Sequence, residues 1–120
     1  MLTQTERRQS TRFRPKDGTM VVNNHALGPV MNISMGGLSF RYMGEDTAKK
    51  ITDKLGIFLG SENILIDKLP TKVVSDKLVS KGSSFLKTST RECSIQFLDL
   101  TKTQREKLIN FISNKTVEMY

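Results

Sequence analysis

From Thr19 onward, the sequence runs in short stretches of alternating apolar and polar residues, which Gly, Pro, Asn or Asp interrupt about every ten residues. Residues 38–42 are the clearest example, because Leu38, Phe40 and Tyr42 alternate with Ser39 and Arg41. A period of two residues is that of a β-strand with one buried face. The pattern therefore predicts an all-β domain whose strands each have one core face and one solvent face.

The same alternation sets the expected strands and the turns between them. Gly28-Pro29 lies inside the second strand, where a proline removes a ladder hydrogen bond, so we expect an edge position or a bulge there. Residues 44–54 are polar and predict a loop or a helical turn from Asp46, and Lys81–Ser89 predicts a hairpin loop. The expected strands are residues 19–22, 25–33, 38–42 and 92–98, with two or three more over residues 55–59, 63–69 and 72–79. The breaks between them are Ser34–Gly37, Gly60-Ser61 and Pro70.

The periodicity changes from two residues to that of a helix near residue 101. Thr101 and Gln104 fit a capping box, and an apolar stripe follows them, so a helix of about three turns is predicted over residues 101–114. Six or so strands in 120 residues favour a closed barrel, because closure removes unpaired edges. The stripe, expected to pack on the barrel, is formed by Leu108, Ile109, Phe111 and Ile112.

The positive charge is concentrated at the start of the chain. The formal net charge is +7 and the pI is about 9.8, which favours an anionic partner. Residues 1–18 contain only Leu2 and Phe13 as large apolar side chains and end at the turn Asp17-Gly18, so we interpret them as a mobile arm. Residues 1–16 carry a net +4, from Arg7, Arg8, Arg12, Arg14 and Lys16 against Glu6.

The counts of cysteine and histidine, and the positions of the candidate nucleophiles, exclude several classes of site. One cysteine and one histidine exclude an internal disulfide and a zinc site of the usual kind. Cys93 falls on an apolar strand face and Ser34 has no base within sequence reach, so we expect neither an enzyme nor a metal site. No signal peptide and no membrane-spanning run is present, so a cytoplasmic location without membrane insertion is expected.

Two short motifs offer chemistry suited to a nucleotide. Arg8 and Arg12 form an RxxxR pattern, and guanidinium groups bind phosphate and the O6/N7 edge of guanine. Asn32, Ser34 and Gly37 follow as NxSxxG at a turn between two strands, where they offer a carboxamide, a hydroxyl and close backbone approach. Each motif alone also fits a simpler structure, namely a solvated tail and an ordinary turn.

Taken together, the two motifs resemble the PilZ domain family. The resemblance extends from Glu6-Arg7-Arg8 through Gly37-Leu38-Ser39-Phe40 to the closing residues 93–100, which precede the helix. It implies a six-stranded antiparallel β-barrel of PilZ type, spanning residues 19–100 of a single domain over 1–120, with a C-terminal helix and a flexible basic N-terminal arm. It also implies a bacterial receptor for the second messenger cyclic di-GMP, with no other cofactor.

The resemblance also implies ligand-binding residues. Arg8 and Arg12 would contact phosphate and guanine, and Asn32 a guanine edge. Ser34 and Gly37 would line the phosphate side, with Arg7 and Gly36 as second contacts. The chain has Asn where the family allows Asp or Asn, which predicts a modestly lower affinity because a carboxamide has one acceptor oxygen. The chain also has no Trp, so stacking on guanine would use arginine planes such as Arg14 or Arg41.

The resemblance places the output of the receptor in a downstream protein of the flagellar, pilus or polysaccharide-synthesis machinery. Two other functions remain open at the level of the sequence. One is a PilZ-like protein-interaction module that binds no nucleotide. The other is a small basic barrel that binds nucleic acid, against which the low aromatic content of 7% argues, because base-stacking platforms need exposed aromatic rings.

Overall fold

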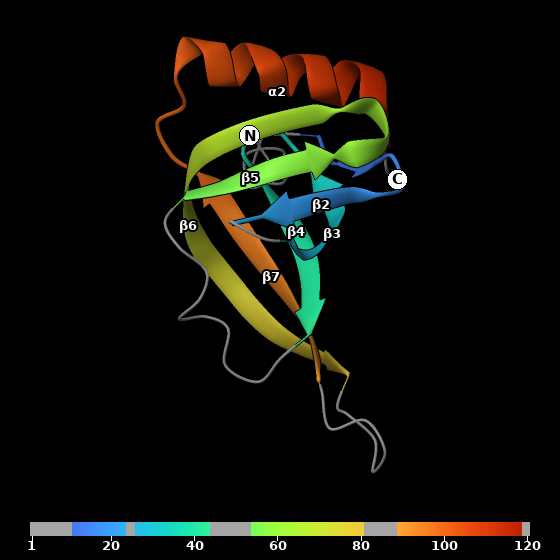
Figure 1. Ribbon diagram of the computed structural model, residues 1–120. Helices are drawn as coiled ribbons and strands as arrows, with labels where there is room; N and C mark the ends of the chain where they lie inside the picture. The colour runs from blue at the N-terminus through green and yellow to red at the C-terminus, as the bar shows by residue number, and fades with distance from the viewer. Residues whose placement is uncertain (1–10, 24–25, 44–53, 81–88, 119–120) are drawn as a thin grey trace, which may run out of the picture.

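The computed structural model describes residues 11–23, 26–43, 54–80 and 89–118. These residues form eight strands, a short 3-10 turn and one α-helix (Figure 1). The first four strands are β1 (Phe13–Pro15), β2 (Thr19–Val22), β3 (Ala26–Ile33) and β4 (Gly37–Met43). They are followed by β5 (Lys54–Leu59), η1 (Gly60–Glu62), β6 (Ile64–Ser80), β7 (Thr90–Phe97), α2 (Lys102–Lys115) and β8 (Thr116–Glu118).

Six of the strands form a closed antiparallel barrel. The sheet order is β2-β5-β6-β7-β4-β3, and β3 pairs back onto β2, which closes the ring. The other two strands extend the sheet outward from β3, first β1 and then β8. The predicted six-stranded barrel with a C-terminal helix is therefore confirmed, and strands β1 and β8 are additions to it.

The inward faces of the strands make one apolar core. Leu38, Phe40 and Tyr42 of β4 are all buried, as their alternation predicted. Ser39, expected on a solvent face, is also buried, and its hydroxyl lies 2.8 Å from that of Ser94 on β7. Ser39 thus keeps the outward side that the alternation predicted, but the expectation that this side is exposed to solvent is wrong at Ser39. A hydroxyl tolerates burial when it is hydrogen-bonded, which explains why a polar residue is found there.

Helix α2 lies across one end of the barrel (Figure 1). The capping box is present as predicted, since the Thr101 hydroxyl accepts from the Gln104 amide and the Gln104 side chain accepts from the Thr101 amide. Ile109 is 46% exposed, so its expected place in the packed stripe is wrong. At helical spacing it lies beside the packed face rather than on it. The buried helix residues are Leu108, Phe111 and Ile112.

Strand β6 is continuous through Pro70, which the sequence indicated as a separator between strand segments. Its first part pairs with β5 as far as Pro70, opposite Lys54, and its second part pairs with β7 from Thr71 onward. Proline lacks an amide donor, and here it lies where β6 passes from one neighbour to the other. Its carbonyl still accepts a hydrogen bond from the Leu98 amide at 2.8 Å.

Pro29 does not place β3 at an edge, because β3 pairs with β2 on one side and with β4 on the other. The β3–β4 register shifts between Val30 and Asn32, so an irregularity lies next to Pro29 rather than at it. Apart from Lys54 and Ser89, the polar segment 44–54 and the loop Lys81–Ser89 lie outside the described residues.

The N-terminal segment is ordered into the sheet closer to its start than expected. The interpretation of residues 1–18 as a mobile arm is wrong for Phe13–Pro15, which form β1. This strand lies between β3 and β8, and Phe13 also packs against the core. Strand β8 was not predicted, because three residues after a helix carry no visible alternation.

Candidate functional site

The side chains of Arg12 and Asn32 meet on the outer face of the barrel. Phe13 of β1 is the Cα partner of Ile33 on β3, and the two strands are antiparallel, so Arg12 lies across from the Ser34 end of β3 and diagonal to Asn32. There Nη1 of Arg12 donates a hydrogen bond to Oδ1 of Asn32 at 2.5 Å. Both side chains are part-buried, so the guanidinium is held in place rather than free in solvent. Arg12 of the RxxxR motif thus contacts Asn32 of the NxSxxG motif.

The turn Ser34–Gly37 continues directly from Asn32 and is held by its own hydrogen bonds. The Ser34 amide donates to the Gly37 carbonyl at 2.8 Å. The Ser34 hydroxyl accepts from the Gly36 amide at 3.1 Å and is 3.4 Å from the Gly37 carbonyl oxygen. Ser34 is 6% exposed, whereas Gly36 is exposed. The buried hydroxyl therefore shapes the turn, and the exposed part of the turn is its backbone at Gly36.

Gly37 is required by the close approach of strand β7. A Cβ atom at this position would lie 2.1 Å from the Ile95 carbonyl oxygen and 3.1 Å from Cα of Gln96. These are backbone atoms, which cannot move aside without distorting the β4–β7 ladder. The last glycine of the NxSxxG motif thus has a structural role that is sufficient to explain it.

The other arginines that were singled out from the sequence differ in whether the structure describes them, in their exposure and in their partners. Arg7 and Arg8 lie outside the described residues. Arg14 is exposed on β1, two residues beyond Arg12. Nε of Arg41 lies 3.1 Å from Oε1 of Glu92 on β7, so this guanidinium is already part of an ion pair. Of the two arginines considered for stacking, Arg14 is the more accessible.

The cross-strand register continues the outer face of the site from β4 to β7 and β6. Ser39 is the Cα partner of Asn32 on one side and of Ser94 on the other. In the neighbouring row, Gln96 is the partner of both Gly37 and Lys72. Gln96 and Lys72 are exposed, and sequence reasoning did not single them out. Only the strand pairing identifies them, because they lie far from both motifs along the chain.

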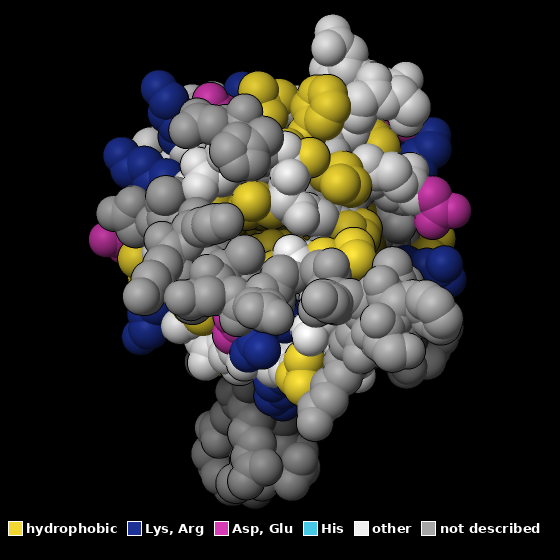
Figure 2. All heavy atoms as spheres, turned by 60° about the horizontal axis from the view of Figure 1, so that its bottom comes forward, with side chains coloured by type: hydrophobic (Ala, Val, Ile, Leu, Met, Phe, Trp, Pro, Cys, Tyr) yellow, Lys and Arg dark blue, Asp and Glu magenta, His cyan; other side chains and the backbone are white. Residues whose placement is uncertain are grey.

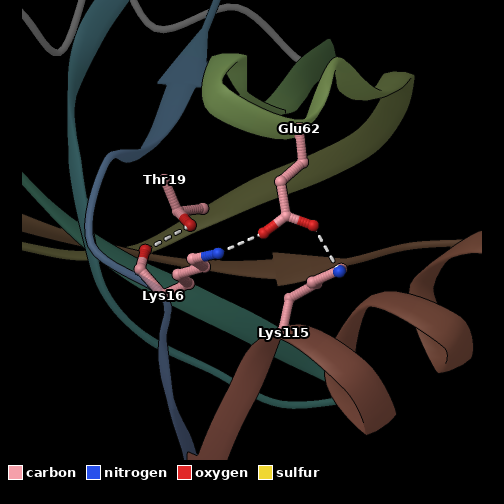
Figure 3. A network of polar contacts seen from close by, with 4 residues as sticks. All are labelled: Lys16, Thr19, Glu62 and Lys115. Carbon is pink, nitrogen blue, oxygen red and sulfur yellow. Dashed lines mark hydrogen bonds and ion pairs between the residues drawn. The ribbon is translucent and has the colours of Figure 1, made fainter.

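A second polar network joins Lys16, which directly follows β1, to Lys115, the last residue of α2. The Glu62 carboxylate of η1 forms ion pairs with both Lys16 and Lys115 (Figure 3). The Lys16 amide also donates to the Lys115 carbonyl at 2.8 Å, and the Lys16 carbonyl accepts from the Thr19 hydroxyl at 2.6 Å. The lysine ammonium groups, Lys115 foremost, hold the pKa of Glu62 below its ordinary value. This network holds Lys16, the residue after β1, against the end of α2 and against η1.

Cys93 is buried in the barrel and unsuited to nucleophilic chemistry. Burial, with a smaller effect from Asp76, raises the pKa of its thiol to about 12. Asp76 itself accepts hydrogen bonds from the Tyr42 hydroxyl and from Nε of Arg91. Among the described residues, no group of three or more His, Cys, Asp or Glu side chains could hold a metal ion. No helix in that part of the chain is long and apolar enough to cross a bilayer.

Lys and Arg side chains lie mainly around the outline of the molecule when it is seen from the lower end of Figure 1, with hydrophobic side chains between them (Figure 2). The exposed apolar residues of the long strand β6 include Val74, Leu78 and Val79. Arg12 contacts Asn32 directly, Arg14 follows it on β1, and Lys72 lies on β6 in the row of Gly37 and Gln96. This face therefore combines positive charge with carboxamide and backbone hydrogen-bonding groups.

Comparison with known proteins agrees with this architecture. The PilZ domain family matches residues 6–114. A solved structure described as the PilZ domain with c-di-GMP of YcgR from Escherichia coli superposes with a TM-score of 0.64 and 16% sequence identity, over 91% of each chain. Comparison with curated proteins gives no match. A family match over most of the chain, together with the same barrel and closing helix, identifies this protein as a member of the PilZ domain family.

Proposed function

We propose that this protein is a receptor for cyclic di-GMP, which it binds on the outer face of strands β3 and β4. The observation that carries the proposal is the contact between Arg12 and Asn32, which places a guanidinium beside the Ser34–Gly37 turn. Support also comes from the similar PilZ domain of YcgR, whose structure is described with c-di-GMP. Binding rather than catalysis is proposed, because the buried Cys93 is not a usable nucleophile.

The hydrogen-bonding capacity left at the contact suits a guanine nucleotide. A guanidinium has five N–H donors, and Arg12 uses Nη1 on Asn32, so its other donors can reach a phosphate or the O6/N7 edge of guanine. Since Oδ1 of Asn32 accepts from Arg12, the Asn32 amide group offers donors, which suit guanine O6 and N7. The carboxamide of Asn32 therefore positions Arg12 and can contact a base at the same time.

The remaining residues of the proposed site act around this pair. Arg7 and Arg8 precede Arg12 in the chain and supply two further guanidinium groups for the two phosphates and two guanines of the ligand. The exposed backbone of Gly36 can approach the ligand at the turn, whose shape the Ser34 hydroxyl maintains, and Gly37 permits the close packing of β7 beside it. In this proposal the ligand draws the residues before Arg12 onto the barrel, and the surface so formed is read by a downstream protein of the motility, pilus or exopolysaccharide machinery.

Calorimetric titration with cyclic di-GMP tests the proposal, with GTP and a short single-stranded oligonucleotide as control ligands. We expect saturable binding of cyclic di-GMP alone. The Arg8→Ala and Arg12→Ala variants should lose high-affinity binding, because each removes a charge-assisted contact to the ligand. Arg105→Ala is the matched control, since it removes the same charge from an exposed position on α2.

The outcomes separate the proposed receptor from the other functions considered. Normal binding by Arg12→Ala would refute the proposed site. Absence of binding together with an unchanged thermal transition would favour a protein-interaction module. Steeply salt-dependent binding of the oligonucleotide, with no preference for cyclic di-GMP, would favour a nucleic-acid-binding barrel.

A further inference from the structure

We propose that Gln96 of β7 and Lys72 of β6 extend the cyclic di-GMP site beyond the two motifs, Gln96 by reading a guanine edge and Lys72 by binding a phosphate. This inference rests on the proposed function above. Neither residue belongs to a motif, and both are assigned from the strand register alone.

The register places both side chains on the same barrel face as Asn32. Asn32 is the partner of Ser39, and Gly37 lies two residues before Ser39 on β4, so all three share the outer face. Gln96 is opposite Gly37, and Lys72 is opposite Gln96. Directly opposed residues of antiparallel strands point to the same side of the sheet. A continuous outer row thus runs from the Ser34–Gly37 turn across β7 to β6.

Gln96 borders the turn more closely than ordinary strand pairing requires. Its Cα lies 3.1 Å from the position that a Cβ of Gly37 would occupy. The amide of the next residue, Phe97, donates to the Gly36 carbonyl at 2.9 Å. Because Gly37 has no side chain, the first side chain beside the turn on this row is that of Gln96, which is exposed. A ligand seated against Gly36 and Gly37 therefore meets the Gln96 carboxamide.

Lys72 supplies a positive charge at the far end of the row. It is exposed, and among the described residues no carboxylate lies within ion-pair distance of it. Lys72 lies three strands from Asn32 and in the neighbouring row, so strand geometry separates them by roughly 14 Å across the strands and about 7 Å along them. A ligand with two nucleotides can extend over such a distance, so that Arg12 and Lys72 each reach a phosphate or a guanine.

The side-chain chemistry fits the two assigned roles. A glutamine carboxamide has one acceptor oxygen and two donor hydrogens, so it can pair with a guanine edge in two hydrogen bonds. A lysine ammonium is a compact charge with three donors, which suits a phosphodiester but does not distinguish one base from another. Gln96 should therefore affect base selectivity, whereas Lys72 should affect affinity alone.

The test is titration of the full chain with cyclic di-GMP and, in competition, with cyclic di-AMP. Lys72→Gln should weaken binding of both ligands about tenfold, in keeping with the loss of one hydrogen bond to a charged group. Gln96→Ala should weaken cyclic di-GMP binding and reduce the preference for it over cyclic di-AMP. Thermal unfolding of both variants should match that of the unchanged protein, because both side chains are exposed.

Lys77→Gln is the matched control for Lys72→Gln. Lys77 is an exposed lysine of the same strand, in the row of Arg41 and Glu92 further from the turn. An equal loss of affinity in both lysine variants would show a general charge effect and overturn the role of Lys72. Normal affinity and selectivity in Gln96→Ala, alongside lost binding in Arg12→Ala, would overturn the role of Gln96 while leaving the proposed function intact. No binding by the unchanged protein would overturn both proposals.

Discussion

Gly37 is the residue whose substitution is most directly limited by backbone packing. Gly37→Ala should lower the free energy of unfolding by about 1–3 kcal/mol, the usual cost of overpacking. The added methyl group would lie 2.1 Å from the Ile95 carbonyl oxygen, which is fixed in the β4–β7 ladder. Chemical denaturation of the two proteins, compared by their midpoints, measures the difference.

Gly60→Ala is the control for this prediction. Its nearest neighbour would be the ring of Phe58 at 3.0 Å, a side chain that is 37% exposed and can turn aside. Its stability should change little. Should Gly37→Ala prove as stable as the unchanged protein, the close approach of β7 would have to be relieved by movement of β4, and the structural role of Gly37 would be wrong.

The Cys93 thiol should be unreactive in the folded protein. Its pKa is raised to about 12 mainly by burial, so the thiolate that reacts with disulfide reagents is scarce at pH 8. We expect reaction with a colorimetric disulfide reagent only as denaturant unfolds the barrel, with the two transitions coinciding. Rapid labelling without denaturant would contradict the burial of Cys93.

At this scale the sequence predicted residue types and motifs but not their contacts. Asn32 and Arg12 were singled out separately for their chemistry, and their mutual hydrogen bond follows from the pairing of β1 with β3. The burial of Ser39 depends on the facing hydroxyl of Ser94, far along the chain. Gln96 has no local signal at all, because its proximity to Gly37 depends on register.

Among the elements, helix α2 offers the sharpest local test. Thr101→Ala removes the hydroxyl that accepts from the Gln104 amide, so it should cost about 1 kcal/mol of stability. Thr103→Ala is the matched control, since it removes the same groups from an exposed position within the first turn. Thermal unfolding followed by circular dichroism measures both. Equal effects from the two substitutions would show that the cap contributes nothing specific.

Elements with strong local signals were predicted well, and those that depend on distant partners were not. Strand Thr19–Val22 and the capping box of α2 agree with the sequence, because alternation and cap chemistry are local. Pro70 indicated a strand break, yet β6 continues because its partner changes at that residue. β1 and β8 are three residues each, too short to show a period, and each is stabilised by pairing with the other.

The ion pairs of Glu62 connect separate parts of the molecule, and their contribution should depend on pH. The pKa of Glu62 is below its ordinary value of 4.5 because Lys115 and then Lys16 donate hydrogen bonds to the carboxylate. A carboxyl with a lower pKa in the folded state stabilises the protein above the unfolded value, and this stabilisation is lost as pH falls. Glu62→Gln should therefore lower the melting temperature at pH 7, with the difference shrinking below about pH 4.5.

Glu106→Gln is the control, because Glu106 is exposed on α2 and its substitution removes the same charge. It should leave the melting temperature at pH 7 nearly unchanged. A melting-temperature difference between Glu62→Gln and the unchanged protein that stayed constant from pH 7 to pH 3 would show that the ion pairs do not account for it.

The pairing of β1 with β8 brings together the two ends of the described chain, since Phe13 is the partner of Glu118. Contacts between residues so far apart in sequence carry the largest loop-closure entropy. The barrel strands β2 to β7 close their ring without either segment. Release of the strand that follows Arg12 would therefore break its pairings with both β3 and β8 and the contact of Phe13 with the core, yet it would leave the ring of barrel strands closed, so it needs only local unfolding.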